Sequence, residues 1–92
     1  MKIVINKCGN GWFGLSQKAY EYLGIDWDGN GYKYNHNRAD VELVKCVETL
    51  GRAADGTGAR LKIVEIPDDV EWEVKKYDGA ECIAVLGMKR QF

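Results

Sequence analysis

A glycine-rich turn near the amino terminus carries the residue types best suited to binding a ligand. Residues 9–16 read Gly-Asn-Gly-Trp-Phe-Gly-Leu-Ser and follow an apolar stretch. Backbone N–H groups in a glycine turn that leads into a helix can bind an anion, and Trp12 and Phe13 can stack on a base or pack on a partner. We predict a binding site here that includes Asn10 and Ser16. The alternative is that both rings fold back over the helix and that the glycines serve only the backbone geometry.

The same turn matches two nucleotide-binding fingerprints only in part. Residues 9–14 satisfy the Gly-x-Gly-x-x-Gly spacing, but a dinucleotide site also needs a second strand that ends in an acidic residue about 20 positions on. Residues 26–30, Asp-Trp-Asp-Gly-Asn, have the composition of a loop instead. Leu15 stands where a phosphate-binding loop carries its lysine. The sequence therefore argues against a dinucleotide enzyme and against a nucleotide hydrolase.

A second polar loop, which precedes the second predicted helix, contains Tyr34, His36 and Arg38. The planar guanidinium of Arg38 can pair with a phosphate or a carboxylate; its alternative role is a solvated loop arginine or a local capping contact. His36 is a poor candidate for a general base because no nucleophile stands near it in the sequence. We therefore assign Tyr34, His36 and Arg38 to the predicted binding site and none of them to catalysis.

Two features keep a small enzyme as an alternative. Cys8 ends a strand just before a helix begins, where a thiolate is stabilised, but the chain has a single histidine to activate it. Paired carboxylates can perform acid–base chemistry, although an acidic cluster more often forms the solvated side of a strand and a turn. The acidic residues that gather around the only proline are Glu65, Asp68, Asp69, Glu71 and Glu73. We predict no catalytic residues, no metal site and no cofactor.

Hydrophobic periodicity predicts the elements that must position these residues. Residues 2–8 are rich in β-branched side chains and apolar on both faces, as in a strand covered on two sides. A helix over residues 17–23 begins after Ser16, and a second helix over about 41–50 begins after Asp40, since serine and aspartate are good N-caps. Each predicted helix ends at a glycine, which adopts the left-handed conformation readily.

The second half of the chain has the pattern of strands. Residues 61–66 form an apolar strand that stops at Pro67. Residues 70–74 alternate strictly between apolar and charged side chains. The turn signal Tyr-Asp-Gly-Ala at 77–80 then predicts a hairpin with a returning strand at 81–86.

This order of elements predicts an α/β (α+β) fold. We expect a small mixed sheet of four to five strands, the fifth being a short strand at residues 32–34, with two helices packed on it and a C-terminal hairpin. The first strand is joined to the next through a helix and is expected to lie parallel to a neighbour, whereas the last two strands are antiparallel. The 92 residues are expected to form a single domain, 1–92.

Composition and charge narrow the classes of partner. A net charge of −1 gives no electrostatic basis for direct nucleic-acid binding. No stretch approaches the roughly 18 apolar residues of a membrane span, and the chain opens with a strand pattern rather than a signal peptide. The three cysteines lack the paired spacing of a disulfide framework or a zinc site. We expect a cytoplasmic protein without membrane partners, and we leave a homo-oligomer open.

Several strings of the chain resemble a family of small, largely uncharacterised proteins encoded by bacteriophages, prophages and some large viruses. The resemblance spans most of the chain and is carried by Lys-Ile-Val-Ile-Asn-Lys-Cys at 2–8, Phe-Gly-Leu-Ser at 13–16, Arg-Ala-Asp at 38–40, the string at 61–74, and Tyr-Asp-Gly at 77–79 through Glu81. The turn departs from the family pattern Cys-Tyr-Gly-Gly-Phe-Gly because it is one residue longer. The Gly-x-Gly-x-x-Gly spacing is therefore an accident of this variant.

The resemblance implies a viral accessory protein rather than a known reaction. Small phage accessory proteins often antagonise host defence, by sequestering a nucleotide signal or by occluding an effector protein. We therefore expect a non-enzymatic binding protein that acts in the host cell cytoplasm as an inhibitor of antiviral defence. Its partner is expected to be a small anionic ligand or a host defence protein. The alternatives are a structural accessory protein of the virus and a small enzyme centred on Cys8 or on the acidic cluster.

Overall fold

The computed structural model describes residues 1–8, 12–32, 34 and 37–88 of the chain. In chain order, the described elements are β1 (Lys2–Asn6), α1 (Gln17–Leu23), α2 (Val41–Leu50), the 3-10 helix η1 (Gly51–Ala54), β2 (Leu61–Glu65), β3 (Val70–Tyr77) and β4 (Ala80–Met88). Neither α1 nor α2 has the length and apolar character needed to cross a membrane.

Both α-helices begin and end where the sequence predicts. Ser16 Oγ accepts a hydrogen bond from the backbone N–H of Ala19 at 3.1 Å, and Asp40 Oδ1 accepts one at 2.8 Å from the second residue of α2. These N-caps satisfy N–H groups that have no partner inside the helix. α1 stops at Gly24, whose φ of 72° is left-handed, and α2 stops at Gly51. The helix boundaries are thus set by local sequence.

The strands form two antiparallel sheets of two strands each, β1–β2 and β3–β4. The α+β class, the two helices and the C-terminal hairpin are confirmed, but the expectation that the first strand lies parallel to a neighbour is wrong. β1 pairs with β2 in antiparallel register, with Val4 opposite Ile63. The reason is that the connection through two helices returns to the end of β1 that it left, where Lys7 N donates to Arg60 O at 2.8 Å. Neither Tyr32 nor Tyr34 lies in the expected fifth strand.

The β3–β4 hairpin turns at Asp78 and Gly79, whose φ values of 50° and 85° are both positive. Positive φ at both central residues is typical of the two-residue turns that match the twist of a hairpin. The register places Lys76 directly opposite Glu81. Residues that face each other across a ladder lie on the same side of the sheet, so these two charged side chains share one face of the hairpin.

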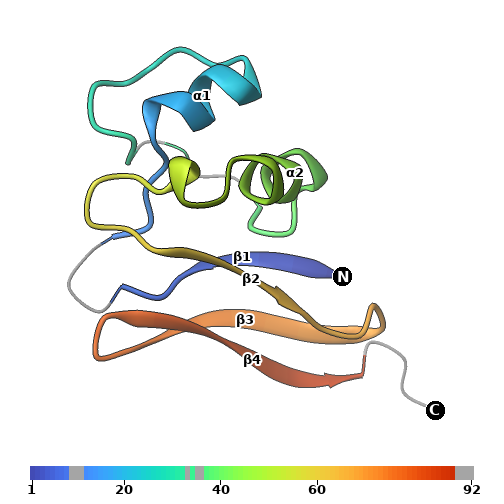
Figure 1. Ribbon diagram of the computed structural model, residues 1–92. Coiled ribbons are helices and arrows are strands. Elements are labelled where there is room, and N and C mark those ends of the chain that lie inside the picture. Colours follow the sequence, from blue (N-terminus) through green and yellow to red (C-terminus); the bar gives the residue numbers. More distant parts are fainter. Residues whose placement is uncertain (9–11, 33, 35–36, 89–92) are drawn as a thin grey trace.

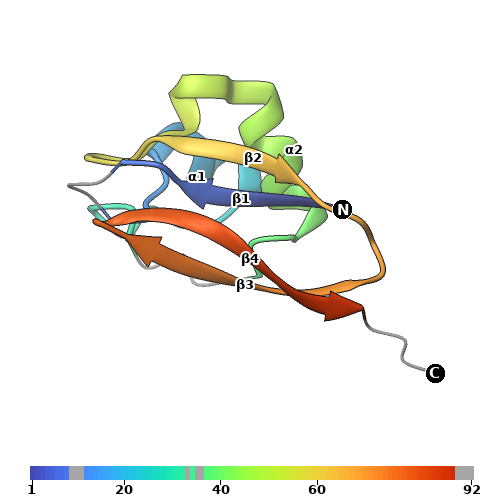
Figure 2. The same cartoon turned by 90° about the horizontal axis from the view of Figure 1, so that it is seen from below.

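The helices and the hairpin lie on different sides of β1–β2. Figure 1 shows α1 and α2 above the β1–β2 ribbon and the hairpin below it, and in Figure 2 the strands follow one another in the order β2, β1, β4, β3. Between the helices and β1 lies a core of fully or almost fully buried side chains. Its members are Val4, Leu15, Ala19, Tyr20, Leu43, Val44, Cys46, Val47 and Ala54. The hairpin therefore lies outside this main core and needs its own contacts to stay beside β1.

Candidate functional site

The edge of β1 that faces away from β2 is closed by two individual residues, Arg38 and Glu81, instead of a strand. In an antiparallel pair, alternate residues direct their backbone groups toward the partner. Lys7 bonds toward β2, so Val4 and Asn6 direct their groups to the other edge. Val4 N donates to Arg38 O at 2.9 Å, and Asn6 N donates to Glu81 Oε1 at 2.8 Å. Arg38 and Glu81 thus satisfy the backbone groups that a neighbouring strand would otherwise pair.

Arg38 and Glu81 are themselves joined by a two-pronged ion pair. Arg38 Nη1 lies 2.6 Å from Glu81 Oε1, and Nη2 lies 3.1 Å from Oε2. The Glu81 side chain is only 3% exposed. Burial alone would raise the pKa of Glu81, but the hydrogen bonds from Arg38 and from Asn6 N, with the charges of Arg38 and Lys76, outweigh it and hold the pKa below its ordinary value. Glu81 is therefore a carboxylate at neutral pH.

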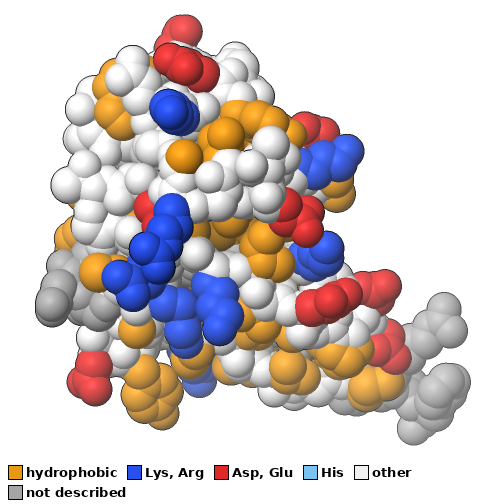
Figure 3. Space-filling view, viewed as in Figure 1, with side chains coloured by type: hydrophobic (Ala, Val, Ile, Leu, Met, Phe, Trp, Pro, Cys, Tyr) orange, Lys and Arg blue, Asp and Glu red, His pale blue; other side chains and the backbone are white. Residues whose placement is uncertain are grey.

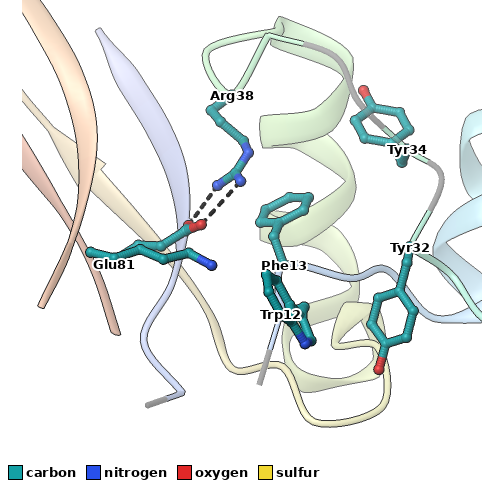
Figure 4. Close-up of a pocket in the computed structure, with 7 residues that line it drawn as sticks. Trp12, Phe13, Tyr32, Tyr34, Arg38 and Glu81 are labelled. Atoms are coloured by element: carbon teal, nitrogen blue, oxygen red, sulfur yellow. Dashed lines mark hydrogen bonds and ion pairs between the residues drawn. The ribbon is translucent and has the colours of Figure 1, made fainter. Parts of the chain in front are cut away.

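An open pocket, which we call the aromatic pocket, lies beside this ion pair. It is lined by four aromatic and three charged side chains: Trp12, Phe13, Tyr32, Tyr34, Arg38, Lys76 and Glu81. Its volume of about 640 Å³ is in the range of pockets that hold small molecules. Figure 4 shows Trp12 and Phe13 on one side of the opening and Tyr32 and Tyr34 on the other. The pocket thus has aromatic walls on two sides.

Both cations of the pocket lie over aromatic faces. The guanidinium carbon of Arg38 is 3.6 Å from the centroid of the Phe13 ring, and Lys76 Nζ is 4.3 Å from the centroid of the Trp12 ring. Such cation–π contacts are attractive because the face of the ring carries negative charge density. Phe13 is half-buried and packs against the core, whereas Trp12 is 67% exposed. Trp12 therefore does not fold back over the helix as a buried lid.

The opposite wall is fixed by hydrogen bonds. Tyr32 Oη donates to Thr57 O at 2.8 Å, and its ring packs closely against Gly14, where an added Cβ would come within 2.9 Å of a ring carbon. The backbone N–H of Tyr34 donates to Tyr20 Oη at 3.1 Å. Burial raises the pKa of the Tyr34 phenol, so this ring is neutral at physiological pH. These hydrogen bonds position the wall formed by Tyr32 and Tyr34 before any ligand binds.

The structure brings together only part of the predicted binding site. Ser16 does not line the pocket, since its hydroxyl donates to Ala53 O and accepts from Ala19 N as the N-cap of α1. Asn10 and His36 lie outside the described residues. The predicted residues that line the aromatic pocket are Trp12, Phe13, Tyr34 and Arg38.

The expectation that backbone amides of the turn bind an anion is wrong at Leu15 and Ser16. Leu15 N donates to Gly31 O at 3.0 Å, and Ser16 N donates to a carbonyl of η1 at 2.9 Å. The neighbouring backbones press closely on this segment: a Cβ on Gly31 would lie 2.0 Å from Leu15 O, and one on Gly56 would lie 2.6 Å from Gly14 C. These two amides are therefore used by the chain itself.

Lys76 and Glu81 belong to the site although neither was predicted from the sequence. A signal was present in the strand pattern, because Val74, Lys76 and Glu81 belong to the face of the hairpin that the alternation assigns to the interior. A charged side chain at an inward position is unusual unless it is paired. The symmetrical spacing of Lys76 and Glu81 about the Asp78–Gly79 turn also predicts that they face each other.

The residues behind the enzymatic alternatives lie elsewhere. Cys8 is half-buried, and its N–H donates to Asn6 Oδ1 at 3.0 Å. The acidic residues around the proline are exposed, and Asp68 binds the amino group of Met1. No group of three metal-binding side chains is found in the described part of the chain. The acidic cluster therefore has the solvated arrangement that its sequence pattern favours.

Two segments that are far apart in the sequence meet at the aromatic pocket. Arg38 opens the Arg-Ala-Asp string, and Glu81 follows the Tyr-Asp-Gly turn at 77–79. Their ion pair joins positions 43 residues apart in the chain. The comparison with known proteins adds no relative to this picture, because no family model, curated protein or solved structure matches the chain.

Proposed function

We propose that this chain is a non-enzymatic binding protein of a phage or mobile element. In this proposal it inhibits host antiviral defence by sequestering a small nucleotide-type ligand in the aromatic pocket. The observation that carries the proposal is the combination, in one open pocket, of two facing aromatic walls with an excess of positive charge. The resemblance to viral accessory proteins supplies the biological setting.

The aromatic walls suit a flat ring system. Trp12 offers a largely exposed indole face, and Tyr32 and Tyr34 stand across the opening from it. A base that stacks on one aromatic side chain gains about 1–3 kcal/mol, whatever its hydrogen-bonding pattern. Because Phe13 packs against the core and Tyr32 Oη is hydrogen-bonded, these two rings lose little side-chain entropy when a ligand enters.

The charges of the pocket suit an anion, and Lys76 is the residue that we expect to bind it. Arg38 uses both Nη atoms on Glu81 and one face on Phe13, so it holds the pocket together rather than meeting a phosphate. Lys76 Nζ has no hydrogen bond or ion pair with any described residue. Two cations against one carboxylate leave one positive charge in excess, which favours a phosphate group beside the stacked ring.

The test is a titration of the purified protein with adenosine and guanosine and with their mono- and diphosphates, followed by Trp fluorescence and calorimetry. We expect each nucleotide to bind more tightly than its nucleoside. Trp12→Ala should weaken both by about tenfold or more, since stacking is lost. Lys76→Gln should remove the advantage of the nucleotide. Lys75→Gln is the matched control, because Lys75 is the adjacent residue on the opposite face of β3, where it pairs with Glu73.

A pull-down from infected-cell lysate separates sequestration from the other candidates. A sponge returns its ligand chemically unchanged on denaturation, whereas an enzyme returns a converted product. Capture of a host protein that depends on Trp12, with no small molecule released, would contradict sequestration and favour occlusion of an effector. Nucleotide affinities that Trp12→Ala and Lys76→Gln leave unchanged would remove the aromatic pocket as the site.

A further inference from the structure

A second hollow, which we call the basic groove, lies between α2–η1 and the β1–β2 ribbon and shares no residue with the aromatic pocket. Its rim carries four cations, Lys7, Arg52, Arg60 and Lys62, and its apolar part is formed by Val47, Leu61 and Ile63. Figure 3 shows lysine and arginine side chains gathered over the left end of the ribbon, in the view of Figure 1. The volume of the groove is about 390 Å³.

The cations of the basic groove are largely unpaired. Within the described part of the chain, Arg52, Arg60 and Lys62 form no ion pair, and Lys7 Nζ reaches only a backbone carbonyl, at 3.5 Å. One carboxylate lines the groove, Asp55, and its Oδ1 accepts a hydrogen bond from the backbone N–H of Leu61 at 3.0 Å. The chain as a whole has a net charge of −1, so this concentration of positive charge is local.

The floor of the groove distinguishes between the anionic partners that this charge would attract. A nucleic-acid backbone uses cations and aromatic platforms for its bases, but no aromatic side chain lines the groove among the described residues. An apolar floor instead suits an aliphatic side chain, because burial against it removes apolar surface from water. A basic rim around an apolar floor therefore matches a peptide in which acidic residues flank an apolar one.

We infer that the basic groove docks an acidic segment of a partner protein, which inserts one apolar side chain against Val47, Leu61 and Ile63 while its carboxylates meet Lys7, Arg52, Arg60 and Lys62. The size of the hollow fits a side chain and its neighbouring backbone rather than a folded surface. The two hollows share no lining residue, and they adjoin where Lys7 Nζ of the groove donates to the backbone carbonyl of Glu81.

The experiment measures fluorescence anisotropy of the intact protein with a labelled peptide that has one leucine flanked on both sides by glutamates. We expect binding at low ionic strength that weakens as salt screens the charges. Arg60→Glu and Lys62→Glu should each lower the affinity by about tenfold, because each replaces an attraction by a repulsion. Lys18→Glu, which changes the net charge equally on the exposed side of α1, should leave the affinity within about twofold.

Two further probes test the floor without changing the protein. A peptide with glycine in place of leucine should bind about tenfold more weakly, as expected from the loss of one buried aliphatic side chain. Equal binding of the glycine peptide would overturn the inference, because charge alone would then explain the interaction. An oligothymidylate that binds as tightly as the leucine peptide would assign the groove to nucleic acid instead. The absence of peptide binding at low salt would end the inference outright.

Discussion

The two edges of β1 are satisfied in different ways. On one edge, a continuous backbone ladder joins β1 to β2 over the whole length of both strands. On the other edge, Arg38 and the Glu81 side chain of β4 accept or donate the hydrogen bonds of Val4 and Asn6. The first edge is closed and regular, whereas the second leaves a hollow with aromatic walls. A binding pocket has formed where Arg38 and the Glu81 side chain, rather than a strand, complete the sheet.

The largest loss of stability should come from breaking the edge of β1 that Arg38 and Glu81 close, which we call the side-chain edge. Glu81→Ala removes the partner of Arg38 and leaves Asn6 N without its acceptor, so we expect a loss of about 3–5 kcal/mol in the free energy of unfolding. Urea denaturation followed by circular dichroism measures it. Glu48→Ala is the control, because Glu48 forms an ion pair with Lys2 that is exposed to solvent. This substitution should change the free energy of unfolding little. Equal effects of the two substitutions would contradict the structural role assigned to Glu81.

A smaller loss of stability should follow from a substitution at Gly31, where two backbone segments lie in close contact. Gly31→Ala places a Cβ 2.0 Å from Leu15 O at a positive φ of 84°, and neither backbone can move away cheaply. We expect a destabilisation of about 3 kcal/mol, measured in the same way. Gly29→Ala is the matched control, since its φ is also positive, at 96°, but no atom lies within 4 Å of the new Cβ. It should cost about 1 kcal/mol, and a similar cost at both glycines would argue against the close approach.

The contribution of the side-chain edge to the free energy of unfolding should depend on pH, whereas the contribution of the β1–β2 ladder should not. The folded-state pKa of Glu81 lies below its ordinary value of 4.5, so the unfolded chain binds the proton more readily. The stability that Glu81 contributes is therefore fully present above that ordinary value and is lost as the pH falls through the lower folded-state value. The difference in unfolding free energy between the wild type and Glu81→Gln should shrink as the pH is lowered from 7 toward 3. A difference that stays constant would show that the charge of Glu81 is not what holds the edge.

The smallest effect on stability should come from the exposed wall of the pocket. Trp12 is 67% exposed and contacts Lys76 mainly through its ring face, so Trp12→Ala should change the unfolding free energy by about 0.5 kcal/mol or less. Phe13→Ala should cost more, because Phe13 packs against the core and under Arg38. Denaturation curves of both variants measure the contrast. A large loss at Trp12 would make it a structural residue and would undermine its use as a binding probe.

Much of the fold could be predicted because its signals are local. Ser16, Asp40 and the two glycines that end α1 and α2 act on backbone groups within a few residues, and the helix boundaries follow from them. The Asp78–Gly79 turn likewise predicts the hairpin and the pairing next to the turn, whereas the register shift between Glu71 and Trp72 has no signal of this kind. The expectation that β1 lies parallel to a neighbouring strand was wrong, because strand direction depends on the path of the whole connection, which here passes through two helices.

The candidate site was predicted only on the side contributed by local motifs. Trp12, Phe13, Tyr34 and Arg38 could be selected by residue type and by their position in loops. The role of Arg38 could not, because its partner Glu81 lies 43 residues away. The local sequence around Arg38 does not show whether its guanidinium pairs with a phosphate in solvent or with a buried carboxylate of the same chain. The same limit explains why Lys76, rather than Arg38, is now the proposed anion-binding residue.

The sequence by itself determined the caps, the helical and strand periodicity, and the hairpin, since each depends on neighbours in the chain and on burial of one face. Only the tertiary structure decided which backbone groups of β1 lacked a strand partner and which distant side chains would satisfy them. Hydrogen-bonding groups in a protein interior must find partners, but the sequence does not specify from which part of the chain those partners come. The placement of Arg38 against Glu81, and with it the aromatic pocket, depends on how segments far apart in the chain pack together.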